Sequence, residues 1–481
     1  MELNDRKTAV TSNFFWRLAE RVGAQGVKFL VELILARILL PDDYGAIALV
    51  TVFITILNVF VDSGLGNALI QKKDADDLDF SSVFWFNLIL SVVLYILLFM
   101  SGPFIAAYYK RPELNPVIRV LGIQVIIAGI KNVQQAFISR TMQFKRFFYA
   151  TLGGTIGAAL LGIVMAFYGC GVWALVGQQL FNVFVDTVIL WITVKWRPHF
   201  RFSFERIRIL FSFGSKLLAS ALLETAYTEI WQLLIGKRYT SSSLAFFNRG
   251  KQLPHLFVNN INSSIDSVLL PVMSSAQDNV NSVRAMTRRS IQVSTFIMAP
   301  LMIGLALTGE VLIRLLLTEK WLPAVPYLRI YCIIYLFYPI HTANLNAIKA
   351  LGRSDLFLKL EILKKIAGII ILIKTIFISP LAVAYGMLAV SILSQIINSY
   401  PNRKLLNYGY ADQVKDILPS VLLAIIMGFA VKLIDLLSLN EISSLVLKVI
   451  NGTSVYLGCA ILLKIESFSF ICEIAKKFYN K

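Results

Sequence analysis

Long apolar segments recur along the whole chain and constrain its fold more than any other feature. A membrane-spanning helix needs roughly 20 consecutive, predominantly apolar residues. The 481 residues are 57% hydrophobic and only 15% charged, whereas a soluble domain is about 25% charged. This pattern predicts an all-α polytopic membrane protein with about 14 transmembrane helices. The predicted spans are 13–39, 44–70, 82–108, 116–138, 148–168, 172–194, 210–235, 246–272, 290–308, 325–348, 357–377, 381–399, 416–436 and 444–463.

Two of these segments leave the number of spans open. The segments 246–272 and 325–348 are weakly hydrophobic, so roughly twelve or thirteen spans stay as alternatives. Elsewhere the cuts are marked by residues that favour turns. Residues 41–43, Pro-Asp-Asp, separate the first two spans, and 169–171, Gly-Cys-Gly, divide a long uncharged run.

Basic residues gather in alternate loops, which predicts the orientation. Cytoplasmic loops of membrane proteins carry an excess of Lys and Arg. If the N-terminus is cytoplasmic, most basic residues fall in loops on that side, and both termini are then cytoplasmic. This bias and anionic lipid explain most of the net charge of +18 without a nucleic-acid partner. The strongest cluster lies at 195–208 and comprises Lys195, Arg197, Arg201, Arg206 and Arg208.

A weak internal repeat suggests two similar halves. Residues 17–71 resemble 216–274 at an offset of roughly 200 residues, and each unit begins with a helix that carries charge. Two similar six-helix halves with a site at their interface are a transporter architecture. We therefore expect a six-helix lobe at 1–208, a second at 209–404, and two additional transmembrane helices with a cytoplasmic tail at 405–481.

The first predicted span carries a stripe of charge that lipid would not tolerate. At about 100° per residue, Arg21 lies ~40° from Arg17, Lys28 ~20° and Glu32 ~60°, with Gln25 at ~80° on the same side. A charge at the bilayer centre costs roughly 2.5–3.5 kcal/mol on insertion scales. The stripe is therefore expected to face an aqueous cavity or a partner. Because its net charge is positive, it suggests an anionic cargo.

A structural interpretation of the same stripe stays open. Glu32 lies four residues after Lys28 and is placed to neutralise it. Arg17 and Arg21 lie nearer the cytoplasmic end, where long side chains snorkel toward water. The substrate-binding interpretation includes Gln25 as a polar neighbour of the cations.

Further polar residues occur in later spans. Lys131 lies deep in the fourth span, Lys216 opens the charged helix of the second half, and Arg249 begins the next one. Asn260 belongs to an asparagine-rich face suited to sugar hydroxyls. All four are predicted to contact substrate, and the alternative for Lys216, Arg249 and Asn260 is hydrogen bonding between helices of the bundle.

Three intramembrane acids are candidates for ion coupling. Glu32, Asp62 and Glu224 lie within predicted spans, and a buried carboxylate can bind a proton or ligate sodium. The choice between H⁺ and Na⁺ is left open. Asp62 has a second interpretation, because it precedes Ser-Gly-Leu-Gly and is placed to cap a helix break.

Several short runs resemble polysaccharide flippases of the colanic-acid and teichuronic-acid exporter type. The runs are LLPDDYG at Leu39–Gly45, DSGLGNALIQ at Asp62–Gln71, SVFWFN at Ser82–Asn87, FNRG at Phe247–Gly250 and YPNRK at Tyr400–Lys404. The similarity covers nearly all of the chain, and it belongs to the multidrug/oligosaccharidyl-lipid/polysaccharide exporter superfamily. The resemblance implies fourteen helices, two pseudo-symmetric lobes with two extra helices, and a V-shaped cavity worked by alternating access.

The resemblance also implies the function and its setting. The expected cargo is an oligosaccharide on undecaprenyl pyrophosphate, moved from the cytoplasmic to the outer leaflet of the bacterial inner membrane for surface polysaccharide biosynthesis. The expected partners are this lipid-linked oligosaccharide, membrane lipids and a coupling ion.

Two competing functions receive less support from the residues. A drug/cation antiporter of the same superfamily would need an acidic or apolar cavity, whereas the charged stripe is cationic. A membrane polysaccharide polymerase or ligase would need a large outer loop, and the longest predicted one is roughly 309–324. The sequence has no P-loop, and the DAD run at 74–76 has no soluble domain around it. The cysteines show no metal-ligand spacing, so no enzyme activity, cofactor or metal site is predicted.

Overall fold

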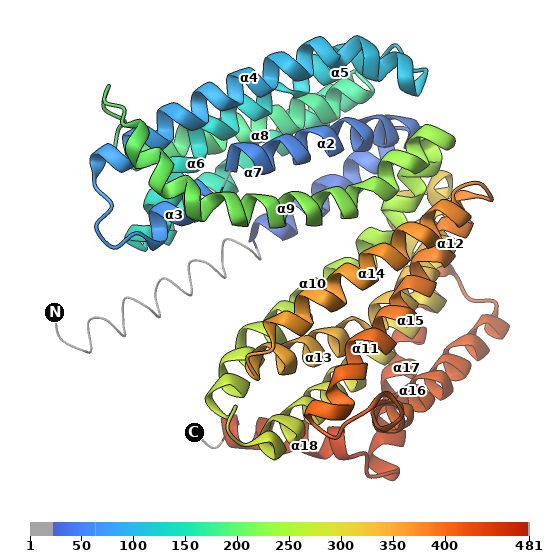
Figure 1. Cartoon of the computed structure of the whole chain (residues 1–481). Helices are drawn as coiled ribbons and strands as arrows, with labels where there is room; N and C mark the ends of the chain where they lie inside the picture. The colour runs from blue at the N-terminus through green and yellow to red at the C-terminus, as the bar shows by residue number, and fades with distance from the viewer. Residues whose placement is uncertain (1–22, 63, 480–481) are drawn as a thin grey trace. The chain divides into compact units, whose positions relative to one another are not determined.

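The computed structural model describes residues 23–62 and 64–479, and the described backbone is helical without a strand (Figure 1). A first helix covers 23–38. Eight helices follow in the first half of the chain: α2 (Pro41–Asp62), α3 (Leu65–Gln71), α4 (Asp77–Tyr109), α5 (Leu114–Leu121), α6 (Ile123–Thr141), α7 (Phe144–Phe167), α8 (Val172–Thr193) and α9 (Phe204–Arg238).

The second half continues with long helices and two short 3₁₀ turns. They are α10 (Ser241–Ser275), α11 (Val280–Leu317), η1 (Glu319–Ala324), α12 (Val325–Leu336), α13 (Tyr338–Ala350), α14 (Ser354–Thr375), α15 (Pro380–Leu405), α16 (Tyr410–Leu433), η2 (Ile434–Leu437), α17 (Glu441–Leu462) and α18 (Glu466–Tyr479). The expected tail after the last span therefore contains a helix, α18, that the sequence analysis did not predict.

Eleven helical segments of the described chain are long and apolar enough to cross a membrane. Each corresponds to one of the predicted spans, so eleven of these are confirmed. The predicted span 13–39 lies partly outside the described residues. The predicted spans 246–272 and 357–377 form helices, α10 and α14, that are too polar to count by composition. The three segments left over are therefore rich in polar or charged residues, and the count of fourteen is not confirmed.

The chain divides into two compact units, Met1–Ala245 and Phe246–Lys481. The first unit includes α9, which the sequence repeat assigned to the second lobe. The predicted lobes are 1–208, 209–404 and 405–481. They stay a prediction, because they follow the internal sequence repeat, whereas the two units are defined by how compactly the chain packs.

In the first unit α9 runs along α2 over most of its length (Figure 1). Two glycines near the ends of α2 allow other backbones to approach: the start of α10 at Gly45 and α9 at Gly64. A Cβ on Gly45 would lie 1.9 Å from the carbonyl oxygen of Ser241, and one on Gly64 would lie 2.5 Å from that of Gly214. Gly64 also has φ +66°, which L side chains rarely adopt. Both close approaches therefore depend on the absence of a side chain at Gly45 and at Gly64.

The start of α4 is held by a buried polar cluster. Asp76 caps the helix, because its carboxylate accepts a hydrogen bond from Asp79 N–H at 2.9 Å. In turn, the carboxylate of Asp79 accepts a hydrogen bond from Asp76 N–H at 3.2 Å. Asp79 is fully buried and pairs with Lys72 at 2.6 Å. The segment between α8 and α9, residues 194–203, lies against the first turns of α4, because Ser203 N–H donates to Ser82 Oγ at 2.9 Å. Part of the SVFWFN run thus anchors α9 to α4.

The second unit has an amide network at one end of its helices. Asn344, Asn402 and Gln413 are almost fully buried. Asn402 Nδ2 donates to Asn344 Oδ1 at 2.7 Å, and Gln413 Nε2 donates to the same oxygen at 2.8 Å. The network joins α13, α15 and α16, and it gives the YPNRK run a structural role, since buried amides need partners.

Candidate functional site

The charged stripe of the first helix is described only in part. Arg17 and Arg21 lie outside the described residues. Gln25 is exposed, and the side chain of Lys28 is 70% exposed. Lys28 Nζ lies 3.9 Å from Glu32 Oε1, at the limit of an ion pair, and an exposed pair of this kind contributes little. Glu32 therefore does not cover the ammonium group of Lys28.

Helix α9 presents a second set of exposed charges in the same unit. Lys216 and Glu224 are both exposed, two turns apart. Lys216 forms no ion pair with any described residue. The segment Phe204–Arg238 nevertheless meets the length and composition of a membrane span. A charge at such a position favours an aqueous surface over lipid.

Lys131 has an ion-pair partner that the sequence did not predict. Its Nζ lies 3.0 Å from Asp186 Oδ2, and the pair joins α6 to α8. Sequence reasoning missed Asp186, although it is the one charged residue in the predicted span 172–194 and could have been found on that ground. The substrate-binding role of Lys131 stays a prediction.

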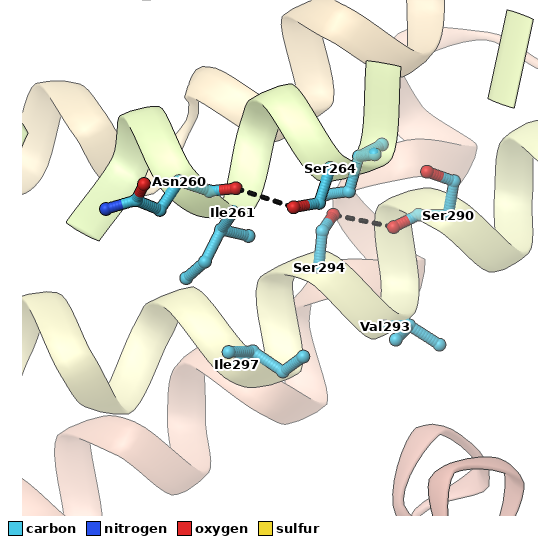
Figure 2. A pocket seen from close by; sticks show the side chains of 8 residues that line it. Asn260, Ile261, Ser264, Ser290, Val293, Ser294 and Ile297 are labelled. Carbon is cyan, nitrogen blue, oxygen red and sulfur yellow. Dashed lines mark hydrogen bonds between the residues drawn. The ribbon is translucent and has the colours of Figure 1, made fainter. Parts of the chain in front are cut away.

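A cavity of about 500 Å³ lies between α10 and α11 in the second unit (Figure 2). Its polar groups are bound mainly to the helix backbones. Asn260 Nδ2 donates to Leu256 O at 2.9 Å, and Ser264 Oγ donates to Asn260 O at 2.8 Å. The surface of the cavity is mostly apolar, and the cavity is lined by Asn260, Ile261, Ser264, Ile265, Ser290, Val293, Ser294 and Ile297.

The few polar groups of this lining come from asparagine and serine side chains. Hydroxyl and amide side chains can exchange their local backbone bonds for bonds to a ligand. Asn260 is thus the predicted substrate contact that the structure places at a cavity.

Arg249 lies in a different environment. The residue is 8% exposed, its guanidinium carbon lies 4.9 Å from the ring centre of Trp321, and Nη1 donates to Gln252 Oε1 at 2.6 Å. Cation–π contact and burial are typical of a structural arginine. Its substrate-binding role stays a prediction.

Asp62 ends α2 and its residue is exposed. The next helix, α3, is preceded by Gly64 in the left-handed conformation and has no side-chain N-cap. The interpretation of Asp62 as a helix cap is therefore wrong, because Gly64 takes the N-cap position. The ion-coupling roles of Asp62, Glu32 and Glu224 stay predictions.

The second unit contains polar pairs whose partners the sequence did not predict. Lys364 Nζ lies 2.6 Å from Glu361 Oε1 on α14, with both side chains mostly covered. His341 Nδ1 on α13 lies 3.2 Å from Asn398 Nδ2 on α15. These residues fall within predicted spans, so their charge and polarity were visible in the sequence, but the partners were not.

The chain matches the sequence model of a family described as "Polysaccharide biosynthesis protein" over residues 34–326. Curated relatives include the teichuronic acid biosynthesis protein TuaB of Bacillus subtilis (strain 168), 28% identical over 300 residues that cover 62% of each chain. The succinoglycan biosynthesis transport protein ExoT of Rhizobium meliloti (strain 1021) is 24% identical and covers 66% of this chain and 65% of its own. The match thus spans less than two thirds of these two relatives.

A third relative matches over more of its length. The lipopolysaccharide biosynthesis protein WzxC of Escherichia coli (strain K12) is 21% identical over 429 residues, which cover 87% of each chain. This similarity covers more of the chain than the family match over residues 34–326.

Solved structures show the fold. An inward closed conformation of the lipid II flippase MurJ covers 94% of this chain and 99% of its own with a TM-score of 0.75 at 15% identity. An inward-facing multidrug resistance MATE family transporter of the MOP superfamily covers 80% and 94% with a TM-score of 0.62 at 16% identity. The predicted all-α, multi-pass transporter fold is thereby confirmed. Because the family model matches more than half of the sequence, the chain belongs to the bacterial membrane family of polysaccharide biosynthesis proteins.

Proposed function

We propose that this protein is a flippase that moves an oligosaccharide linked to undecaprenyl pyrophosphate from the cytoplasmic to the outer leaflet. It acts as a transporter and not as an enzyme, and it works by alternating access. The family match and the relatives named for polysaccharide biosynthesis support the cargo class. The MurJ-like fold supports the transport of a bulky lipid-linked molecule.

One observation carries the proposal: lysines stay exposed in the predicted span 13–39 and in the membrane-length helix α9. Lys28 keeps 70% of its side chain exposed beside Glu32, and Lys216 is exposed within Phe204–Arg238. Facing lipid would cost roughly 2.5–3.5 kcal/mol for each charge. An aqueous surface that binds the pyrophosphate would instead stabilise them, because ammonium groups bind phosphate oxygens through charge-assisted hydrogen bonds. Arg17 and Arg21 extend this surface in the proposal.

The sugar part is assigned to the second unit. The cavity at Asn260 offers amide and hydroxyl groups beside isoleucine side chains, which match the mixed polar and apolar faces of a sugar ring. The membrane is the bacterial inner membrane, with both termini in the cytoplasm. The basic segment 195–208 supports this orientation.

Transport is further proposed to be coupled to H⁺ or Na⁺. Glu32, Asp62 and Glu224 are the acids predicted for this role in the first unit. Exposed Glu224 and partly covered Glu32 are reachable from water. Coupling through either would lower the repulsion between the cationic surface and an entering cation.

The headgroup assignment is tested with Lys28→Ala and Lys216→Ala. A hydrogen bond between charged groups contributes about 1.5–3 kcal/mol, so each variant should lower the flipping rate about ten- to a hundredfold in vesicles that hold a polyprenyl-pyrophosphate-linked sugar. Lys374→Ala removes an equally exposed lysine from the last turn of α14 and should keep the wild-type rate.

The cargo itself is tested in cells. Depletion of the protein should lead to accumulation of a lipid-linked oligosaccharide in the cytoplasmic leaflet. Wild-type flipping by the double variant Lys28→Ala/Lys216→Ala would show that the lysines are structural. Accumulation of a drug instead of a glycolipid would favour the antiporter.

A further inference from the structure

The first unit contains a buried ion pair between two membrane-crossing segments. Lys131 Nζ lies 3.0 Å from Asp186 Oδ2, and the two side chains are only 17% and 12% exposed. Lys131 belongs to the span Leu114–Thr141 and Asp186 to the span Val172–Thr193. Charges removed from water at such a depth lose several kcal/mol of hydration each. The pair therefore needs either a full set of hydrogen bonds or a function.

The hydrogen bonds of Asp186 are incomplete. A carboxylate has two oxygens that each accept hydrogen bonds. Oδ2 is bound by Lys131, but Oδ1 is buried and accepts no bond from any described residue. Asp79 Oδ1 is also without a hydrogen bond, but a second cation, Arg206, lies 3.5 Å from it. No described cation other than Lys131 pairs with Asp186, so its open oxygen is left uncompensated, which is costly for a buried acceptor. The open oxygen is the place where a proton can bind.

The packing around Asp186 keeps its environment confined. Gly154 of α7 faces it so closely that a Cβ there would lie 3.3 Å from Asp186 Cβ and 2.9 Å from Asn182 O. On the side of α6, Lys131 is the one cation within ion-pairing distance of Asp186 among the described residues.

Other ionisable groups on the neighbouring helices lie elsewhere on them. Arg146, in the first turn of α7, donates to Thr193 O in the last turn of α8, and Arg140 of α6 donates to Leu69 O at 2.6 Å. Arg119 of α5 lies over Phe99, 4.2 Å from its ring centre. The remaining ionisable groups on α2, α7 and the helix at 23–38 are Asp42, Asp43, Tyr44, Asp62, Lys145, Tyr149, Lys28, Glu32 and Arg37.

The interior of this unit holds further polar groups without a described partner. Asn87 of α4 is 1% exposed, and neither its amide nitrogen nor its oxygen is hydrogen-bonded. Thr51 and Asn58 of α2 and Gln124 of α6 each leave a buried polar atom unbonded. Helices α2, α4 and α8 each pack against α6. Together these groups make the interior hydrophilic enough to accept water, which a proton needs in order to reach Asp186.

We propose that Asp186, rather than Glu32, Asp62 or Glu224, is the proton-binding site of the transport cycle, with Lys131 as its counter-ion. The proton adds to Oδ1 and converts the carboxylate to a neutral acid, while Lys131 keeps its own proton. The ion pair becomes a weaker hydrogen bond, and the contact between α6 and α8 loosens. The proton leaves when the site opens to the other side and the ion pair forms again. A proton needs one open oxygen, whereas sodium needs several, so a proton fits this site better.

The proposal rests on the proposed flippase function and is tested first by its response to a pH gradient. Vesicles with purified protein and a fluorescent polyprenyl-pyrophosphate-linked sugar report the flipping rate with and without the gradient. For one coupled proton, the wild-type rate should change by up to about tenfold per pH unit. Asp186→Asn should bring the ratio of the two rates to one.

Single substitutions can unfold a buried pair, so a double variant keeps the test decisive. Lys131→Met/Asp186→Leu replaces the pair by apolar groups of similar volume, which is often tolerated. It should fold and show no response to the gradient. A matched control is Lys448→Met/Asp435→Leu, which removes a Lys–Asp pair with a buried lysine at 2.5 Å between α17 and η2 and should keep the response. A wild-type response in Lys131→Met/Asp186→Leu would overturn the proposal.

A second measurement needs no transport. Infrared spectra of the purified protein should show a protonated-carboxyl band that titrates, that is lost in Asp186→Asn and that persists in the control double variant. The proposal is wrong if Asp186→Asn leaves every titrating carboxyl band in place. Failure of the wild type to flip lipid would count against the flippase function, while the infrared result would still decide the proton site.

Discussion

The buried carboxylate at the start of α4 allows a quantitative prediction about stability. Asp79 is fully buried and pairs with Lys72, whose side chain is 18% exposed. Arg206 lies 3.5 Å away but is 35% exposed, so its contribution is screened and small. Breaking a buried pair by neutralising one partner costs about 3–5 kcal/mol. Asp79→Asn keeps the shape and an acceptor for Asp76 N–H, so it isolates the loss of charge.

We expect Asp79→Asn to destabilise the first unit by about 3 kcal/mol, the low end of that range, because Lys72 keeps some access to water. For a unit of this size, 1 kcal/mol shifts the midpoint of thermal unfolding by about 2–4 °C. The midpoint should therefore fall by about 6–12 °C. Fluorescence-detected size-exclusion chromatography after heating the detergent-solubilised protein measures this shift.

The matched control for Asp79→Asn is Asp76→Asn, which removes the same charge from the same turn. Asp76 is 49% exposed and asparagine is an equally good N-cap, so this change should cost well under about 1 kcal/mol. Equal shifts for the two variants would refute the reasoning, because burial would then have no influence.

Two further predictions concern backbone packing and orientation. Gly64→Ala should destabilise the protein by about 1–3 kcal/mol more than Gly169→Ala in the same thermal assay, because both have positive φ but only Gly64 has a backbone oxygen within 4 Å of the added Cβ; similar midpoints would contradict this. In a cysteine-free background, Phe200→Cys, at a site that is 93% exposed, should resist a membrane-impermeant thiol reagent in intact cells. Tyr168→Cys, at an 84% exposed site, should react, and the reverse pattern would invert the topology.

Hydropathy predicted the spans well where the helices are apolar and less well where they carry charge. The predicted spans 44–70 and 325–348 are confirmed as membrane-length segments, although the helix is interrupted at Gly64 in the first and at Phe337 in the second. Window hydropathy does not register such breaks, because they come from glycine and proline geometry. In α10 and α14 some of the polar residues that lower the hydropathy bind other side chains or line the cavity.

Partners across the fold were beyond the reach of sequence patterns. Glu32 and Lys28 are four residues apart, so their proximity follows from helix geometry alone. Lys131 and Asp186 are 55 residues apart, and only the packing of α6 on α8 brings them together. Arg249 illustrates the same limit, because its cover by Trp321 depends on how η1 packs on α10.

Composition and residue patterns were enough to establish the membrane class, the confirmed spans, the family and the segments where charge enters the membrane. These properties depend on local composition and helical periodicity, which each segment carries regardless of its neighbours. Only the tertiary structure decided which charges are paired and which stay exposed. That decision depends on desolvation by helices distant in sequence: packing covers the pair of Lys131 and Asp186, while Lys28 and Lys216 stay exposed.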